Sequence, residues 1–130
     1  MAALFLKGGN AVTADAIYER VLALMFSGVN EKTDMLTQFL STLNIHLLEL
    51  LDKENGFRET PLTEAPIITE MTDIVDYNYK ILAFLPFGIA GVMMAEDDPN
   101  IAVQYKNKYE DEKAKCVVCK FVEVVNDEIF

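Results

Sequence analysis

The chain begins with an amphipathic pattern of helical period. After Thr13, apolar residues recur at intervals of three and four through Ile17, Val21 and Leu24. This spacing places them on one face of a helix, with Thr13 well suited as its N-cap. Ser27-Gly28 supplies a stop signal, because glycine readily takes the left-handed conformation that ends many helices. The pattern therefore predicts a first helix between these two signals.

A second helix, over about 33–51, has the widest apolar face of the chain. That face contains Leu36, Phe39, Leu40, Leu43, Leu47, Leu50 and Leu51. An irregular region from about 52 to 75 follows, where Pro61 and Pro66 prevent a regular helix. A connection of this length usually serves a function or contacts a partner. Within it, 66–71 is suited either to forming a short strand or to lying extended along a neighbouring chain.

Two further helices, over about 77–95 and 100–122, meet at the acidic corner 96–99. Pro86 is expected to kink the first, because proline removes a backbone donor and clashes with the preceding turn. Asp98 can cap the second, with Pro99 in the first helical position, where its missing N–H costs nothing. So short a connection makes the two helices antiparallel neighbours.

These elements predict an all-α fold with one domain over residues 1–130. We expect an antiparallel bundle of about four helices, with an extended loop over about 52–75 and a C-terminal tail over about 123–130. The chain has 130 residues and is 52% hydrophobic, which is enough to fold around its own core.

The charge restricts the partners that the chain can bind. A net charge of −10 and a pI near 4.4 argue against binding to nucleic-acid phosphates or to an anionic membrane surface. An acidic wall could still let double-stranded DNA slide past without adhering. No signal peptide or membrane-spanning run is visible, so we expect a protein made in the reducing cytoplasm with free thiols.

Cys116 and Cys119 form the most conspicuous chemical motif, a Cys-x-x-Cys pair. A redox pair normally opens a helix, where the dipole lowers the thiol pKa, whereas this pair falls near the end of a predicted helix. A structural zinc site would need two more ligands, and the chain has one histidine and no other cysteine. We interpret the pair as two ordinary thiols.

The remaining candidates for chemistry have simpler structural interpretations. His46, the sole histidine, has no nucleophile at a recognisable spacing and is interpreted as a packing residue. The acidic corner lacks the ligand spacing of a calcium loop, and helix capping explains it. Gly88 and Gly91 lack a phosphate-loop signature and are interpreted as contacts for close helix packing. We expect no catalytic, metal or cofactor site and no enzyme activity.

Tyr105 and Tyr109 lie four residues apart, on one face of the last helix. Two interpretations stay open. The pair is either an interface stripe or a half-buried face whose hydroxyls reach water.

Three stretches, taken in order, carry a family resemblance. The first is the helix pair 14–51, whose second member ends in LLELLD at 47–52. The second is the connection PLTEAPII at 61–68, leading to 73–77. The third is LPFGIA at 85–90, followed by AEDDP at 95–99 and a Tyr-x-x-x-Tyr-Glu pattern at 105–110. Together they resemble phage head–tail connector (portal adaptor) proteins, which are small, mostly helical neck subunits.

This resemblance implies a structural role in the virion. Such subunits assemble beneath the portal as a homo-oligomeric ring, commonly of about twelve copies. The ring extends the DNA channel, joins the capsid to a neck or tail-completion protein, and lets double-stranded DNA pass without specific binding. The protein would then reside in the virion neck, at the portal vertex, and in the host cytoplasm during assembly.

The resemblance also indicates which surfaces to consider as interfaces. The tail would insert between portal subunits through Val124, Val125, Ile129 and Phe130, and the loop would embrace a neighbouring copy. The loop residues considered for that contact are Phe57, Leu62, Pro66, Ile67, Ile68 and Met71. The main alternative is a small acidic helical adaptor or regulatory domain that binds a host protein, and an enzyme using His46 and the cysteines is a third.

Overall fold

The computed structural model describes the backbone of residues 11–26 and 35–129, and side chains as far as Cys116. The described part is mainly helical. The elements are, in order, β1 (Val12–Thr13), α2 (Ala14–Leu24), α3 (Leu36–Glu49), α4 (Leu51–Asn55), β2 (Ile74–Val75), α5 (Tyr79–Met93) and α6 (Pro99–Ile129). The prediction of a helical protein is therefore confirmed at this coarse level.

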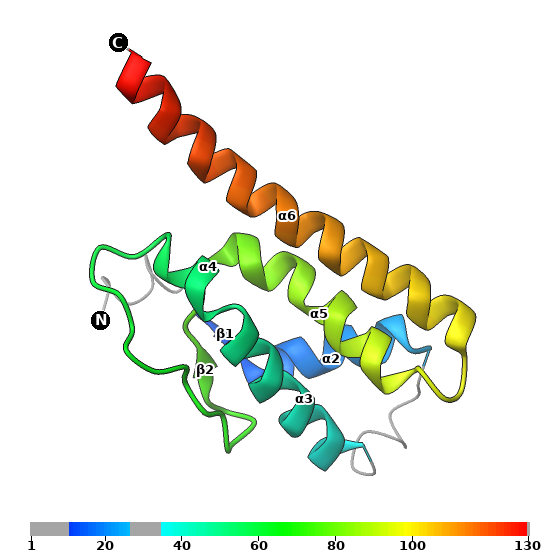
Figure 1. The fold of residues 1–130 in the computed structure, drawn as a ribbon. Helices are drawn as coiled ribbons and strands as arrows, with labels where there is room; N and C mark the ends of the chain where they lie inside the picture. Colours follow the sequence, from blue (N-terminus) through cyan, green and yellow to red (C-terminus); the bar gives the residue numbers. More distant parts are fainter. Residues whose placement is uncertain (1–10, 27–34, 130) are drawn as a thin grey trace.

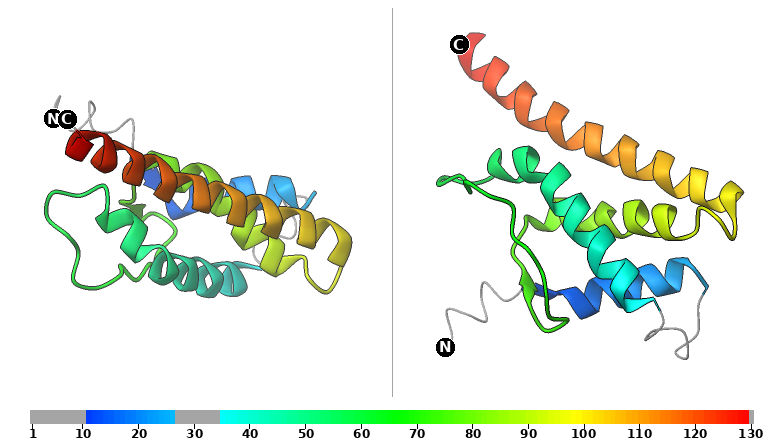
Figure 2. Two further views of the ribbon diagram at one scale, coloured as in Figure 1. Left: turned by 45° about the horizontal axis from the view of Figure 1, so that its top comes forward. Right: turned by 60° about the horizontal axis from the view of Figure 1, so that its bottom comes forward.

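Helix α5 lies in the middle of the fold and contacts α2, α3 and α6 (Figures 1 and 2). Its sequence, YKILAFLPFGIAGVM, is apolar on nearly every side, and ten of its residues are buried. A helix that is apolar all round needs cover on several faces. The three surrounding helices provide that cover.

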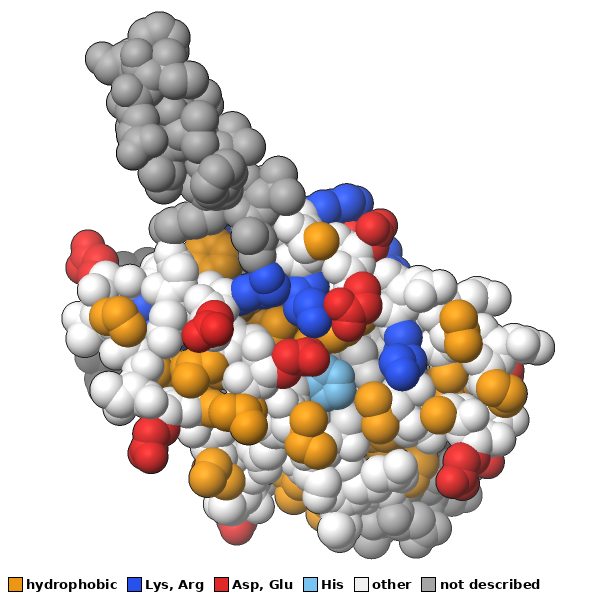
Figure 3. Space-filling view, viewed as in Figure 1, with side chains coloured by type: hydrophobic (Ala, Val, Ile, Leu, Met, Phe, Trp, Pro, Cys, Tyr) orange, Lys and Arg blue, Asp and Glu red, His pale blue; other side chains and the backbone are white. Residues whose placement is uncertain are grey.

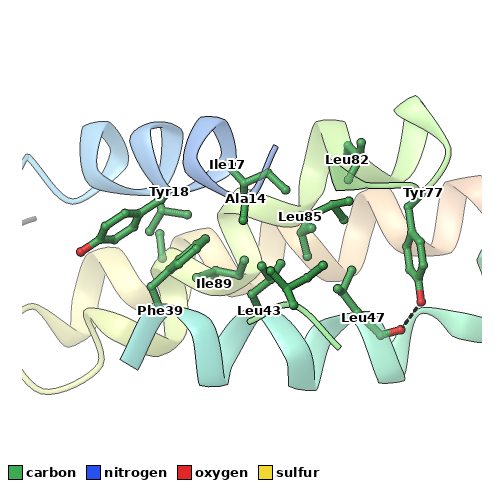
Figure 4. Packing of buried hydrophobic residues seen from close by; sticks show 14 of the residues in the cluster. Ala14, Ile17, Tyr18, Phe39, Leu43, Leu47, Tyr77, Leu82, Leu85 and Ile89 are labelled. Carbon is green, nitrogen blue, oxygen red and sulfur yellow. Dashed lines mark hydrogen bonds between the residues drawn. The ribbon is translucent and has the colours of Figure 1, made fainter. Parts of the chain in front are cut away.

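The core between α2, α3 and α5 is filled by interdigitating large side chains (Figure 4). Tyr18 of α2 stacks on Phe39 of α3 with ring centroids 4.4 Å apart. Leu43 and Leu47 of α3 and Leu85 of α5 are fully buried in the same cluster. These α3 residues belong to the apolar face expected from the sequence.

The acidic corner forms as predicted. The Ile101 N–H donates to Asp98 Oδ1 at 3.3 Å, and Pro99 is the first residue of α6. Helix α6 then runs back along α5 (Figure 1). The predicted N-cap at Thr13 is also confirmed, because its hydroxyl oxygen accepts from the Ala16 N–H at 3.2 Å.

The two glycines of α5 let α6 approach closely, as expected. A Cβ atom at Gly88 would lie 2.7 Å from Cδ1 of Tyr109. One at Gly91 would lie 2.6 Å from Cγ of Lys106 and 3.2 Å from the carbonyl oxygen of Ala102. Any larger residue at Gly88 would force the helices apart or displace a buried ring.

Several predicted boundaries need correction. The second predicted helix is split, because α3 ends at Glu49 and the short α4 follows. The fourth does not stop near 122, since α6 continues to Ile129, so the backbone of the expected tail over 123–129 is helical. Pro86 is retained within α5. The predicted stop at Ser27-Gly28 lies outside the described residues.

The loop between α4 and α5 contains no strand at 66–71. Its strand is β2, which pairs antiparallel with β1 in the register Val12↔Val75 and Thr13↔Ile74. Two backbone bonds, from the Ala14 N–H to the Asp73 carbonyl and from the Asp15 N–H to the Met71 carbonyl, continue this contact. This small sheet, which ties the loop to the start of α2, was not among the elements predicted from the sequence.

Candidate interaction surfaces

The irregular loop is held against the helices by two asparagine side chains. Asn44 of α3 donates from Nδ2 to the Ile68 carbonyl at 3.0 Å and accepts from the Ile68 N–H at 2.7 Å. Asn55 of α4 makes the same pair with Leu62, at 3.0 and 2.8 Å. Each asparagine amide thus bonds to the N–H and the carbonyl of one loop residue, as a neighbouring strand would. The irregular loop offers no backbone partner for these groups, so the amides satisfy them.

A buried carboxylate fastens the other end of the loop. Glu54 is 3% exposed, and its two oxygens accept from Arg58 Nε and from the Asn78 N–H, each at 2.6 Å. Arg58 also donates to the backbone carbonyl of Asp76. Because the charge is both paired and hydrogen-bonded, this cluster can hold the entry to α5 in a buried position.

The tyrosine beside this cluster is also fixed. The Tyr77 hydroxyl donates to the Leu47 carbonyl (Figure 4). Burial, together with the nearby Glu54 charge, raises the pKa of Tyr77 to about 12, although Arg58 opposes this rise. The buried Tyr77 side chain therefore links the end of the loop to α3.

Most of the loop residues considered as an interface face the protein itself. Ile68 is 5% exposed and belongs to the core, while Phe57, Leu62 and Met71 are half-buried against it. The Asn44 bonds turn Ile68 toward the core, and the contact of the six residues with a neighbouring copy stays a prediction. Pro66 is half-buried, and Ile67 is 77% exposed.

The two tyrosines of α6 both bond within the chain. Tyr109 is 3% exposed and donates to a carboxylate oxygen of Glu49, while the half-buried Tyr105 donates to the Leu24 carbonyl at 2.8 Å. Tyr109 thus faces the protein's own core, and the interface interpretation of the pair stays a prediction. Tyr105 is half-buried, as the alternative expected, and both hydroxyls donate to acceptors within the protein.

Tyr109 is the centre of a small polar cluster between α3 and α6. Lys113 Nζ lies 5.0 Å from the Tyr109 ring centroid and 3.7 Å from Glu49 Oε1. Burial raises the pKa of Glu49, but the Tyr109 hydroxyl and the Lys113 ammonium outweigh it, so the pKa lies below its ordinary value. Burial and the bond to Glu49 raise the pKa of Tyr109. These groups hold α3 to α6 as an ion-paired contact.

His46 packs beside this cluster, as expected. It is 7% exposed, its Nδ1 lies 2.8 Å from the Thr42 carbonyl, and its ring meets Tyr109 edge-on at 5.3 Å. The carbonyl can only accept, so Nδ1 carries the proton. The backbone of its own helix thus satisfies the side chain, which agrees with the packing interpretation.

The cysteine pair lies in the middle of α6, not near its end, because α6 is longer than predicted. Cys116 is half-buried against the core, and the side chain of Cys119 lies outside the described residues. Among the described residues, no three His, Cys, Asp or Glu side chains gather as metal ligands would.

The tail residues Val124, Val125 and Ile129 have helical backbone in α6, but their side chains, and all of Phe130, lie outside the described part. The backbone of α6 continues past the start of α5 and away from the other helices (Figures 1 and 2). The portal contact proposed for these residues stays a prediction.

Two exposed apolar residues of α3 were missed by the sequence analysis. Ile45 and Leu48 are 66% and 65% exposed. They lie three residues apart, and neither belongs to the apolar face predicted for this helix. Their position outside that face was the one signal in the sequence that could have identified them as exposed. Figure 3 shows hydrophobic side chains over α3 and the loop, below a band of mixed charges along the border with α6.

Within the described residues, no helix combines the length and apolar character needed to cross a bilayer. Comparisons of the chain with protein-family models, with curated proteins and with solved structures find no match.

Proposed function

We propose that this chain is a structural subunit of a phage neck, a head–tail connector that forms a ring under the portal. In this proposal it has no catalytic role. It extends the DNA channel and joins the capsid to a neck or tail-completion protein. Residues 1–130 would act as one connector domain, in which α2, α3, α5 and α6 form the antiparallel bundle.

The observation that carries the proposal is the ordered set of three stretches described above. Each stretch supplies part of one body: the first provides α2 and α3, the second the loop fastened by Asn44 and Asn55, and the third the α5–α6 hairpin. The acid-acid-Pro corner and the Gly88 contact account for the geometry of that hairpin. A shared scaffold explains why the three motifs occur together in this order.

Charge and shape support the same role. A chain of net charge −10 suits the wall of a channel through which DNA must pass without adhering. The backbone of α6 continues past α5. In this proposal the projecting part of the helix contacts the portal. A heterologous contact between identical subunits closes into a ring when the rotation permits.

A mass measurement with the portal tests ring formation. The chain is mixed with a candidate phage portal protein, and the complex is studied by native mass spectrometry and electron microscopy. We expect a ring below the portal whose added mass is a whole multiple of 14.6 kDa. A chain that stays monomeric beside an assembled portal would favour the host-protein adaptor instead.

Deletion of 123–130 tests the proposed portal anchor. The truncated chain should keep its thermal midpoint and lose only the far-ultraviolet signal of the removed helical residues, because the core residues that the structure describes lie before the deletion. Its binding to the portal should be lost, since apolar and aromatic anchors dominate interface energies. Wild-type affinity in the truncated protein would exclude this anchor while leaving the ring open to test.

A further inference from the structure

Helix α3 carries more apolar residues than its core face can use. Its buried residues are Phe39, Thr42, Leu43, His46 and Leu47. Ile45 and Leu48 lie off this face, and each leaves about two thirds of its surface exposed to solvent. Residues three apart on a helix are neighbours, so the two side chains form one ridge.

The loop adds a third exposed apolar side chain beside this ridge. The Asn44 amide holds the Ile68 backbone by two hydrogen bonds, which brings the loop alongside α3. In extended backbone, successive side chains point to opposite sides. Ile68 therefore enters the core at 5% exposure, and Ile67 points outward at 77%. We call Ile45, Leu48 and Ile67 the α3–loop surface.

The α3–loop surface lies in the acidic part of the chain. Residues 35–73 contain seven acidic and two basic residues. Glu64 and Glu70, both exposed, stand three residues before and after Ile67. Arg58 and the buried Glu54 pair with each other, so neither adds to the charge of the surface, and six acidic residues and one basic residue remain. The segment that carries the ridge is thus acidic on balance, and two exposed carboxylates flank Ile67 along the loop.

We propose that the α3–loop surface binds an amphipathic, lysine- or arginine-rich helix of a partner protein. Apolar residues of that helix would cover Ile45, Leu48 and Ile67, and its flanking cations would meet Glu64 and Glu70. A ridge of residues three apart suits the groove of a second helix. This inference does not depend on the connector function.

The charge also selects against other occupants. A second copy that met this surface with the same face would set its own Glu64 and Glu70 against these two carboxylates, which opposes self-association through this face alone. Anionic lipid surfaces and nucleic-acid phosphates are repelled for the same reason. The cationic helix is the occupant for which both the apolar and the electrostatic parts of the surface are complementary.

Fluorescence anisotropy with a labelled amphipathic helix of leucine and lysine tests the proposal. A scrambled peptide of the same composition and a leucine–glutamate helix serve as probe controls. We expect the full chain to prefer the leucine–lysine helix over both. The double variant Ile45→Ser/Leu48→Ser should weaken this binding by about tenfold or more, because two apolar contacts are lost.

Two further variants separate the surface from general charge attraction. Glu64→Lys/Glu70→Lys should weaken binding and reduce its salt dependence. Val103→Ser, which alters a 55% exposed side chain on α6, should leave the affinity unchanged and so serves as the matched control. All these positions are exposed, so circular dichroism should show unchanged folding.

Three results would overturn the proposal. One is equal affinity of the wild type and the Ile45→Ser/Leu48→Ser variant for the leucine–lysine helix. Another is equally tight binding of the leucine–glutamate helix. The third is self-association of the wild-type chain that the double variant abolishes, since the occupant would then be a second copy. Light scattering on the same samples detects that case.

Discussion

Replacing Gly88 with alanine tests the closest approach of α5 and α6. The added Cβ would lie 2.7 Å from Tyr109 Cδ1 and 2.9 Å from His46 Nε2. Carbon atoms in van der Waals contact are about 3.5–4.0 Å apart, so the rings would have to move by roughly 1 Å. Tyr109 cannot do so freely, because its hydroxyl bonds to Glu49 and its ring meets Phe84 at 5.6 Å.

The magnitude follows from two opposing effects. Overpacking a well-filled core costs about 1–3 kcal/mol, and the upper half of this range applies because His46 is also held, by the Thr42 carbonyl. Alanine in a helix gains about 1 kcal/mol over glycine. We therefore expect Gly88→Ala to lower the free energy of unfolding by about 1–2 kcal/mol.

Urea unfolding followed by circular dichroism measures this change, with an unaltered slope as the check on two-state behaviour. The matched experiment repeats the substitution in a Tyr109→Leu background, where the obstructing ring is absent. There the cost should fall, because only the contact with His46 Nε2 then remains. Equal costs in both backgrounds, or a Gly88→Ala variant as stable as the wild type, would refute the close-contact reasoning.

Three other predictions follow from single contacts. Asp98→Ala should destabilise the fold by about 1 kcal/mol through loss of the α6 cap, and Asp98→Asn by much less, as measured in urea. Glu54→Ala should cost roughly 3 kcal/mol, because Arg58 and the Asn78 N–H lose a buried partner, whereas the exposed Glu59→Ala should stay within about 0.5 kcal/mol. The raised pKa of Tyr77 means that its contribution to stability is complete below about pH 10, the ordinary tyrosine value, and is lost as the pH rises through about 12. Unfolding measured across this window should show a smaller loss for Tyr77→Phe, and an equal loss would contradict the assignment.

Local sequence signals predicted the helix starts better than the helix ends. Thr13 and Asp98 were identified because a cap and the helix it opens are adjacent in sequence, and the bonds are short-range. The length of α6 was underestimated although no glycine or proline follows Val122, because the apolar tail was interpreted as a separate segment. Close helix packing at Gly88 was predicted, but the residue that packs there was not, since Tyr109 comes from another helix.

The arrangement of the loop could not be read from the sequence. Its direction depends on pairs far apart in the chain, such as Asn44 with Ile68 and Glu54 with Asn78. The spacing of asparagine and glutamate residues along the sequence does not indicate which distant backbone group each side chain will bond to. Which of two adjacent isoleucines faces the core was for that reason undetermined, and the exposed α3–loop surface was missed with it.

The two asparagine clamps also determine how the loop exchanges its backbone hydrogens with solvent. In a segment without regular structure, most amide protons should exchange through small local openings. The N–H groups of Ile68 and Leu62 are exceptions, because each is bonded to a side-chain oxygen anchored in a helix. They should be better protected than the Thr69 and Glu70 N–H groups, which bond to Asp73 within the loop itself. The nitrogen atom of each asparagine amide adds to this protection, since it donates to the carbonyl of the same loop residue. An aspartate of nearly the same shape would set an oxygen against that carbonyl and release the loop at that point.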